Sequence, residues 1–540
     1  MKEKNKNPIQ SIARDYFNYL GTHLPQQCAS DEFYFLPRSE KAIEYLNVLD
    51  DLTPEKIFDH IQYVRNLLNK LPPDEMSYLE EEIDRSLLRQ SMRSFIREFE
   101  SIKVWQSDPT LYVKIPLFAA DNLLSRGGIP RDQLKDDLLS LFIQIPSFLR
   151  LAIENIHLPS EIALKVSIDM TRDAIRFFRY DIPAHTVFET EGDNELSAKN
   201  KEMLDAWERF SKDLHELPFV DSYAIGEDGL KDIFDISMSY PRSPEEILER
   251  ARYEYNKTYD KLCTLAGQLD GKKTWEEVIY EQSRITSSPE EILQKYREEV
   301  QELRLFFHSK DIISFPQGEE VRVLPTPSYL LSLRATASYK APMTGEAENH
   351  GIFFITPGQE ALGLIATHSP YLAAHETYPG HHILDHIRIH HFNPIRRQIE
   401  SPLFYEGWAC YAELLLDELG YVHNPFLRII GLQRQLWRNL RAELDIGLQT
   451  GKINRIQAIK KIEALGFPPK RAQRQVRRFC LTPGYQSCYS MGMQEILKLR
   501  KRYASQLAKR TFHDILLGGG QLPFHLVERR LEKEKQDDNG

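Results

Sequence analysis

Apolar residues recur every three or four positions through most of the first 310 residues, with polar residues between them. This period matches one face of an amphipathic α-helix. Proline lies where several of these segments begin, and the first turn is where its missing N–H costs least. Examples are Thr53-Pro54-Glu55, Leu158-Pro159-Ser160 and Ser243-Pro244-Glu245-Glu246. The pattern predicts a helical amino-terminal lobe over residues 1–310.

The pattern changes between about residues 318 and 358. The segments VRVLPTPSYLL, RATASYKAP and GIFFITPG combine β-formers with Pro and Gly breaks, which is typical of short strands. Helical periodicity then resumes. A chain of 540 residues exceeds what one hydrophobic core normally supports, so we expect two lobes or one large domain with a central cleft. The patterns predict a mainly α protein whose second lobe, residues 311–540, carries the small β-sheet.

Composition narrows the class of protein. Hydrophobic residues at 41% and charged residues at 27% are ordinary for a soluble globular chain. The first residues lack the apolar core of a secretory signal, and no apolar run is long enough to span a bilayer. A net charge of -10 gives no general attraction to nucleic acid. We therefore expect a cytoplasmic protein that binds neither nucleic acid nor membranes, with reduced thiols because its five cysteines are scattered.

Histidines are concentrated in one segment, which reads His375-Glu376-Thr-Tyr-Pro-Gly-His381-His382. In the zincin motif H-E-x-x-H, two His four positions apart share a helix face and bind zinc, while the Glu polarises the metal-bound water. Here Ser369-Pro370 predicts the start of the helix, but Pro379 occupies the fourth position after His375. The simple motif is therefore broken.

Two histidines compete for the place of the second metal ligand. Pro379 cannot donate a backbone hydrogen bond and Gly380 can adopt dihedrals closed to other residues, so we expect the helix to bulge there. A bulge of two residues would bring His381 to the ligand position. Without a bulge, His382 would share the face of His375 nearly two turns away.

A third ligand is expected from a second helix. Ser401-Pro402 begins a helical segment that runs from Leu403 to Leu419 and ends at Gly420. Glu406 and Glu413 are seven positions apart on it and share one face. A carboxylate there, together with two histidines, would leave one zinc position open, as catalytic sites require. The alternative is that both acidic residues form the solvated edge of the helix.

These two motifs resemble the signature pair of the domain of unknown function 885 family. Its members carry HE-x-Y-P-G-H-H-L-Q and E-G-W-A-x-Y-A-E, and are grouped with the helical zinc peptidases of the gluzincin clan. The resemblance continues in Asp445-Ile-Gly447-Leu-Gln449, in Arg478-Phe479 with Pro483-Gly484 and Tyr489, and in the strand-like segment from Gly351 to Thr356.

The resemblance implies a gluzincin architecture, with residues 311–540 as the catalytic lobe and the sheet beside the active-site cleft. In gluzincins the third ligand is a Glu about two dozen positions after the second His, and Glu406 follows His381 by 25 positions. The implied zinc ligands are therefore His375, His381 and Glu406, with Glu376 as general base. Gln449 and Tyr485 depart from the family's His and Gln at positions expected near the active-site wall, which concerns substrate choice or activity.

The sequence and the resemblance together predict a zinc-dependent hydrolase acting on short peptides, as a carboxypeptidase or an oligopeptidase. Tyr489 would donate to the oxyanion, and Arg478 would hold the substrate's carboxylate; packing and a surface salt bridge are the respective alternatives. An edge strand containing Phe354 would pair with the peptide backbone, and His382 would contact substrate. The rival functions are hydrolysis of a non-peptide amide or ester, and a helical binding protein without catalytic zinc.

Overall fold

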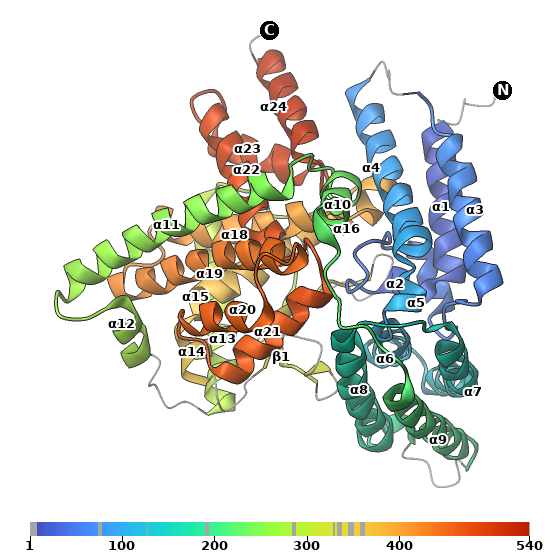
Figure 1. Cartoon of the computed structure of the whole chain (residues 1–540). Coiled ribbons are helices and arrows are strands. Elements are labelled where there is room, and N and C mark those ends of the chain that lie inside the picture. The colour runs from blue at the N-terminus through green and yellow to red at the C-terminus, as the bar shows by residue number, and fades with distance from the viewer. Residues whose placement is uncertain are drawn as a thin grey trace.

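The computed structural model describes residues 8–73, 78–126, 128–188, 194–282, 288–327, 330–331, 337–343, 350–356 and 362–538. These residues form a mainly α-helical protein with one small sheet, as predicted. The amino-terminal helices stand together on the right of Figure 1. They are α1 Pro8–His23, α2 Pro25–Ala29, α3 Pro54–Asn69, α4 Leu79–Ile96, α5 Val104–Ser107, α6 Thr110–Ser125, α7 Arg131–Asn155, α8 Glu161–Arg176 and α9 Asn194–Glu216.

The remaining helices form the other half of the molecule, on the left and at the top of Figure 1. They are α10 Gly226–Asp232, α11 Pro244–Leu269, α12 Trp275–Gln282, α13 Pro289–Lys310, α14 Leu362–Thr367, α15 Ser369–Glu376, α16 His381–Ile389, α17 Pro394–Gln398, α18 Pro402–Glu418, α19 Pro425–Gln449, α20 Arg455–Glu463, α21 Pro469–Leu481, α22 Ser487–Tyr503, α23 Lys509–Leu517 and α24 Phe524–Asp538. Helix α11 packs against α19, and α13 packs against α15.

Local capping explains where several helices begin. Helix α11 starts with a capping box in which the side chains of Ser243 and Glu246 each bind the other's backbone N–H. Thr53 precedes Pro54 at the start of α3. The Ser160 hydroxyl accepts from the N–H of Ala163 at the start of α8, so Pro159 lies just outside that helix. These starts were readable from the sequence because each depends on a few neighbouring residues.

The sheet contains three strands, β1 Val321–Pro325, β2 Ala337–Lys340 and β3 Gly351–Ile355, in the order β1-β3-β2. Strand β3 pairs in parallel with β1 and antiparallel with β2, so that Phe354 lies between Leu324 and Ser338. The expectation that the strand carrying Phe354 is an edge is therefore wrong. Both sides of β3 are already hydrogen-bonded, and a peptide cannot add to it. Parts of the predicted β region fall outside the described residues.

Helices α18 and α22 cross closely enough to exclude side chains from the contact. A Cβ on Gly407 would lie 2.5 Å from the backbone carbon of Gly492, and a Cβ on Gly492 would lie 2.0 Å from the carbonyl oxygen of Leu403. Glycine at both positions lets the two backbones touch. This crossing places Glu406, on α18, beside Tyr485 and Tyr489 at the start of α22.

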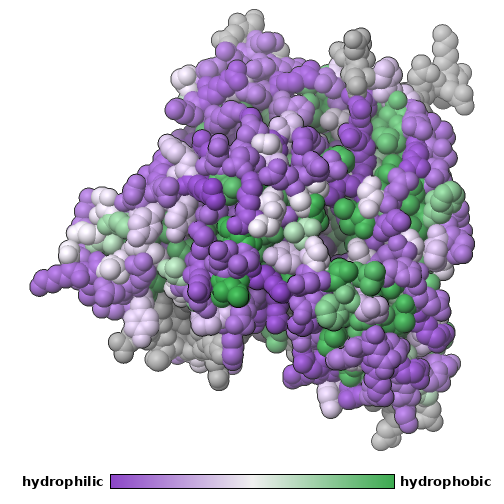
Figure 2. Space-filling model, viewed as in Figure 1, coloured by the Kyte–Doolittle hydropathy of each residue, from purple (hydrophilic) through white to green (hydrophobic). Residues whose placement is uncertain are grey.

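The molecular surface is mostly polar, in keeping with the composition of the chain. Hydrophilic residues cover most of the face drawn in Figure 2, and apolar residues gather near its middle and over the amino-terminal helices on its right. Among the described helices, none combines the length and the apolar character needed to cross a bilayer. All five cysteines are free thiols.

Candidate metal centre

The helix is interrupted between the two halves of the histidine-rich segment. Helix α15 ends at Glu376 and α16 begins at His381. The N–H of Gly380 donates to the carbonyl of Ala374 at 3.0 Å, and a Cβ on Gly380 would lie 1.9 Å from the carbonyl oxygen of His375. Only glycine permits this approach. The predicted bulge is therefore wrong: the chain leaves one helix and starts another, and His381 heads the second.

Three side chains from three helices meet beyond this break. Oε2 of Glu406 lies 3.5 Å from Nε2 of His375 and 3.7 Å from Nε2 of His381. One donor atom from each residue lies within 4.8 Å of the others, and all three residues are buried. This is the group that the sequence predicts as metal ligands, and it could hold a metal ion.

The donor atoms fit zinc in spacing and chemistry. Tetrahedral zinc with bonds of about 2.0–2.1 Å separates its ligand atoms by about 3.4 Å, close to the separations around Glu406. Oε2 of Glu406 and Nδ1 of His381 are buried, and neither has a hydrogen-bond partner. A buried carboxylate oxygen without a donor is costly unless a cation or proton satisfies it. The arrangement therefore suits a bound cation.

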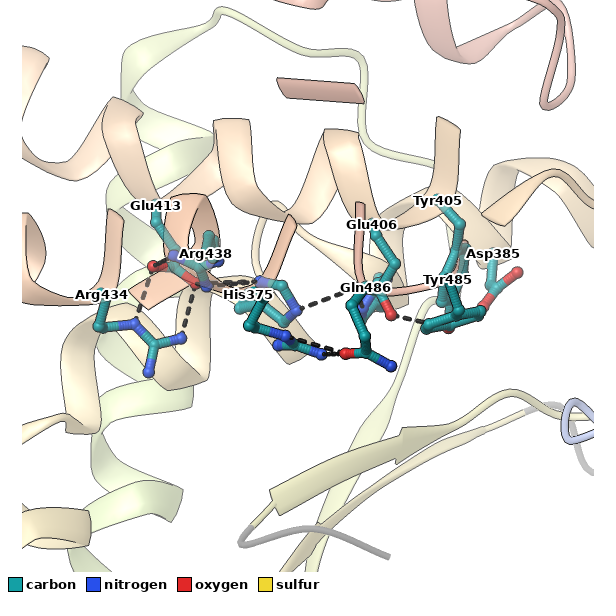
Figure 3. Close-up of polar contacts among 11 residues, drawn as sticks. His375, Asp385, Tyr405, Glu406, Glu413, Arg434, Arg438, Tyr485 and Gln486 are labelled. Carbon is teal, nitrogen blue, oxygen red and sulfur yellow. Dashed lines mark hydrogen bonds and ion pairs between the residues drawn. The ribbon is translucent and has the colours of Figure 1, made fainter. Parts of the chain in front are cut away.

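Glu406 is oriented by a tyrosine that sequence reasoning treated only as a departure from the family pattern. The Tyr485 hydroxyl donates to Oε1 of Glu406 at 2.8 Å, and Figure 3 shows the other side of the carboxylate facing His375. Oε2 also faces His381. Burial alone would raise the pKa of the Glu406 carboxyl, but the neighbouring imidazoles of His375 and His381 hold it well below its ordinary value. Glu406 is therefore ionised and fixed in direction.

His375 is oriented from its other ring nitrogen. Nδ1 of His375 lies 2.9 Å from Oε1 of Glu413. Glu406 and Glu413 share one face of α18, as predicted. Arg434 binds both oxygens of Glu413 at 2.7 and 2.8 Å, and Arg438 binds them from the next helical turn. Burial opposes ionisation of Glu413, but the two arginines keep its pKa well below the usual range. The proton of His375 is therefore held on Nδ1, and Nε2 faces Glu406.

His381 is held by stacking. Its ring lies 3.9 Å from the ring of Tyr405, with an interplanar angle of 15°. The Tyr405 hydroxyl donates to Asp385 at 3.0 Å, and Arg388 donates to the same carboxylate at 2.9 Å. Tyr405 directly precedes Glu406, so one turn of α18 supplies both a ligand and the support for another ligand. No local pattern in the sequence predicts this contact.

His382 lies outside the three-residue group. Its Nε2 is 3.2 Å from Oε2 of Glu319, and its Nδ1 is 3.2 Å from the hydroxyl of Tyr339. Arg304 and Tyr378 also bind Glu319. Burial would raise the pKa of Glu319, but these hydrogen bonds lower it to about 2. The geometry therefore places His381, rather than His382, beside Glu406.

The remaining predicted residues surround the centre. The side chain of Glu376 is buried and makes no hydrogen bond with a described residue. The ring of Tyr489 lies 6.4 Å from that of His375 and nearly parallel to it, and the Arg441 guanidinium lies 3.6 Å from the Tyr489 ring centre. Arg478 is partly exposed, and no described carboxylate forms an ion pair with it.

The two departures from the family pattern have different surroundings. Tyr485 touches the metal group, as expected of the active-site wall. Gln449 donates to the carbonyls of Phe479 and Cys480 at 3.0 and 3.2 Å, and accepts from the N–H of Ile225 at 3.3 Å. These contacts fasten the end of α19 to the end of α21. The contacts of Gln449 are therefore those of a packing residue, and none reaches the three metal-binding candidates.

Two solved structures share the fold of this chain, and a family model matches most of its sequence. The structures of two proteins described as putative lipoproteins match nearly the whole chain, each at 18% identity. The Shewanella oneidensis protein has a TM-score of 0.77 and covers 96% of this chain and 99% of its own; the Colwellia psychrerythraea protein has a TM-score of 0.79 and covers 98% and 99%. No curated protein matches. A family model described as "Bacterial protein of unknown function (DUF885)" matches residues 40–531, and the chain therefore belongs to the DUF885 family.

Proposed function

We propose that this protein is a zinc-dependent hydrolase, a peptidase that acts on short peptides as a carboxypeptidase or oligopeptidase. The observation that carries the proposal is the buried group of His375, His381 and Glu406, with Glu376 directly after the first ligand. Two imidazoles and one carboxylate leave a fourth zinc position for water, whereas a structural site closes with a fourth protein ligand. The presence of Glu376 also favours catalysis, because a structural site has no use for it.

The proposed chemistry divides between the metal and the chain. Zinc bound by the three ligands would lower the pKa of its water to about 7 and polarise the scissile carbonyl. Glu376 takes a proton from the water that attacks the scissile carbonyl, and later gives that proton to the leaving amine. Its carboxylate is suited to this role because no described side chain competes for it.

Tyr489 is the proposed hydroxyl donor to the oxyanion. Its ring lies beside that of His375, and burial raises its pKa, so the phenol keeps its proton at neutral pH. The Arg441 guanidinium lies over the Tyr489 ring, where its positive charge would stabilise the negative charge that develops on the oxyanion. Tyr489 therefore acts as a neutral donor in this mechanism.

Arg478 is the proposed partner of the substrate's carboxylate. Burial alone would lower its pKa, but Tyr489 and the carboxylate of Glu32 raise it, so the guanidinium remains charged. It has no ion-pair partner among the described residues and can bind a carboxylate through two parallel N–H donors. Recognition of a chain end favours carboxypeptidase or oligopeptidase action. The paired strand β3 has no part in this proposal.

The cytoplasm remains our proposed location, because the five free thiols suit a reducing compartment. The two structurally similar proteins are described as lipoproteins, which makes the cell envelope the rival. Cell fractionation followed by immunodetection separates the two: recovery in the membrane fraction would contradict the cytoplasmic proposal.

Glu376→Gln is the test of the proposed reaction. The purified wild-type protein should cleave members of a mixed short-peptide library, and Glu376→Gln should bind zinc equally well but lose at least about a thousandfold in rate. Glu418→Gln, a change near the end of α18 that lies outside the metal group, is the matched control and should keep both properties. Zinc binding without peptide cleavage by the wild type would overturn the peptidase proposal and favour a non-peptide amide or ester, or a binding protein.

A further inference from the structure

A second group of basic side chains, made up of His368, Arg434 and Arg471, lies beside α15, the helix that carries His375. His368 precedes α15 and His375 follows it by seven residues on that helix, a rise of about 10 Å. On the neighbouring α19, Arg434 donates to Nδ1 of His368 at 3.4 Å, and Arg438, one turn later, reaches His375. The group around His368 therefore lies about two helical turns from the metal ligand.

Two buried N–H donors in this group have no acceptor among the described residues. Burial, aided by Arg434 and Arg471, lowers the pKa of His368, so its ring is neutral. Because Arg434 donates to Nδ1, the ring proton lies on Nε2, which is buried and unpartnered. Nη1 of Arg471 is also buried and unpartnered, and the guanidinium lies 4.8 Å from the ring centre of Phe467.

No carboxylate of a described residue neutralises Arg471. The charges that act on it most strongly are Arg474 and Arg434, both positive, and it forms no ion pair with a described residue. Arg434 is already bound to Glu413 through Nε and Nη2. A buried guanidinium beside other cations is unfavourable unless an anion joins it. Since the whole chain carries a net charge of -10, this local excess of positive charge is specific to the site.

We propose that Arg471 and His368 form an anion subsite that binds a carboxylate side chain of the peptide substrate. The inference rests on the proposed peptidase function and names its substrate class: peptides with an acidic residue near the cleaved bond. Charge-assisted hydrogen bonds from the guanidinium and from Nε2 would satisfy both unpartnered donors. The subsite is separate from Arg478, which follows Arg471 by seven residues on the same face of α21.

The spacing predicts the position of the acidic residue. An extended peptide advances about 3.3 Å per residue, so the rise of about 10 Å between His368 and His375 corresponds to about three residues. Arg471 and Arg478 are separated by the same rise along α21. The acidic side chain should therefore lie about three residues from the scissile bond, on the side away from the carboxylate held by Arg478.

Binding of matched peptides tests the subsite without requiring turnover. Zinc-loaded Glu376→Gln protein is titrated calorimetrically with N-acetylated alanine hexapeptides that carry one Glu or one Gln at each position in turn. At one position Glu should bind about ten- to a hundredfold more tightly than Gln, as expected for a desolvated charged hydrogen bond. Adding Arg471→Gln should reduce this preference to within about twofold, and Arg471→Lys should keep part of it.

The control is Arg477→Gln, which removes an exposed charge from the same helix and should keep the full preference for Glu. Absence of a Glu preference at every position, or its survival in Arg471→Gln, would overturn the proposal. Binding of inorganic phosphate that depends on Arg471, without discrimination between the peptides, would also overturn it. If the wild type cleaves peptides but binding shows no preference for Glu, only the subsite proposal is refuted. If binding shows the preference for Glu but the wild type cleaves no peptide, only the hydrolase proposal is refuted.

Discussion

The two carboxylate oxygens of Glu406 have different surroundings. Oε1 accepts from Tyr485 at 2.8 Å, while Oε2 is buried without a donor and faces both histidines. A supporting hydrogen bond of this kind fixes the direction of the ligand before the metal arrives. Tyr485 therefore has a positioning role, although the sequence marked it only as an unusual residue at that place.

Tyr485→Phe removes this hydrogen bond and little else. Because supporting partners of metal ligands are typically worth about 10- to 100-fold in metal affinity, zinc affinity should fall by about tenfold, measured by competition with a fluorescent chelator. Tyr34→Phe is the matched control, since the Tyr34 ring packs 5.3 Å from that of Tyr485 and should leave the affinity unchanged. An unchanged affinity in Tyr485→Phe would show that Glu406 is held by other contacts.

At the residue scale, the sequence predicted the group of His375, His381 and Glu406 through its resemblance to the DUF885 pattern. It left His381 and His382 as rivals, since the choice depends on the path of the chain after Glu376. Glu319, a partner of His382, lies in a loop 63 residues before it, and the partner Tyr339 lies on β2, 43 residues before it. Contacts between such distant segments leave no local pattern to read.

At the scale of elements, the break between α15 and α16 depends on Gly380. Its N–H binds the end of α15, and a Cβ would lie 1.9 Å from one carbonyl oxygen and 2.4 Å from another. Trp408 donates to the carbonyl of Pro379 at 2.8 Å and ties the turn to α18. The turn thus sets the distance between the histidine helices and the glutamate helix.

Gly380→Ala should therefore disturb both stability and the metal site. Backbone atoms cannot move aside as a side chain can, so we expect a loss of about 3 kcal/mol in the free energy of unfolding and at least tenfold weaker zinc binding. Urea denaturation of the zinc-free protein measures the first effect. Gly267→Ala is the control, because it lies in α11 with nothing within 4 Å of its Cβ position and should be neutral or stabilising by up to about 1 kcal/mol. Equal effects of the two changes would contradict the role of Gly380.

Predictions for elements succeeded where the determinants were local. Pro402 and the capping box at Ser243 mark helix starts in the sequence and in the structure alike. The edge position of the strand with Phe354 was wrong, because strand order depends on β1, some 30 residues earlier in the chain. The bulge was wrong for a related reason: Pro379 and Gly380 signal an interruption, but only packing on α18 decides whether the helix resumes in line.

At the scale of the whole molecule, buried titratable groups act on stability in opposite directions. Burial lowers the pKa of His60 and of His513 to about 4. Their neutral forms stabilise the protein fully above pH 6.5, and this contribution is lost as pH falls from 6.5 through about 4. Burial raises the pKa of Asp50 and of Asp445 to about 7, so their contribution is full below about pH 4 and is lost as pH rises through 7.

His513→Asn isolates one of these contributions. Asparagine can keep the hydrogen bond to the carbonyl of Ile312 but carries no titrating proton. Between pH 6.5 and 4 the wild type should lose up to about 3 kcal/mol more stability than the variant, measured by urea denaturation of the zinc-free proteins at several pH values. Parallel pH profiles for the two proteins would show that His513 does not titrate as its burial implies.

The proposed function depends above all on a metal held by His375, His381 and Glu406. The most direct measurement is the number of zinc ions per chain in the purified wild type, in His381→Gln and in His382→Gln. We predict one zinc in the wild type and in His382→Gln, and less than a tenth of that in His381→Gln. A wild-type protein without zinc would contradict the central claim. Zinc kept in His381→Gln and lost in His382→Gln would show that the second ligand had been assigned to the wrong histidine.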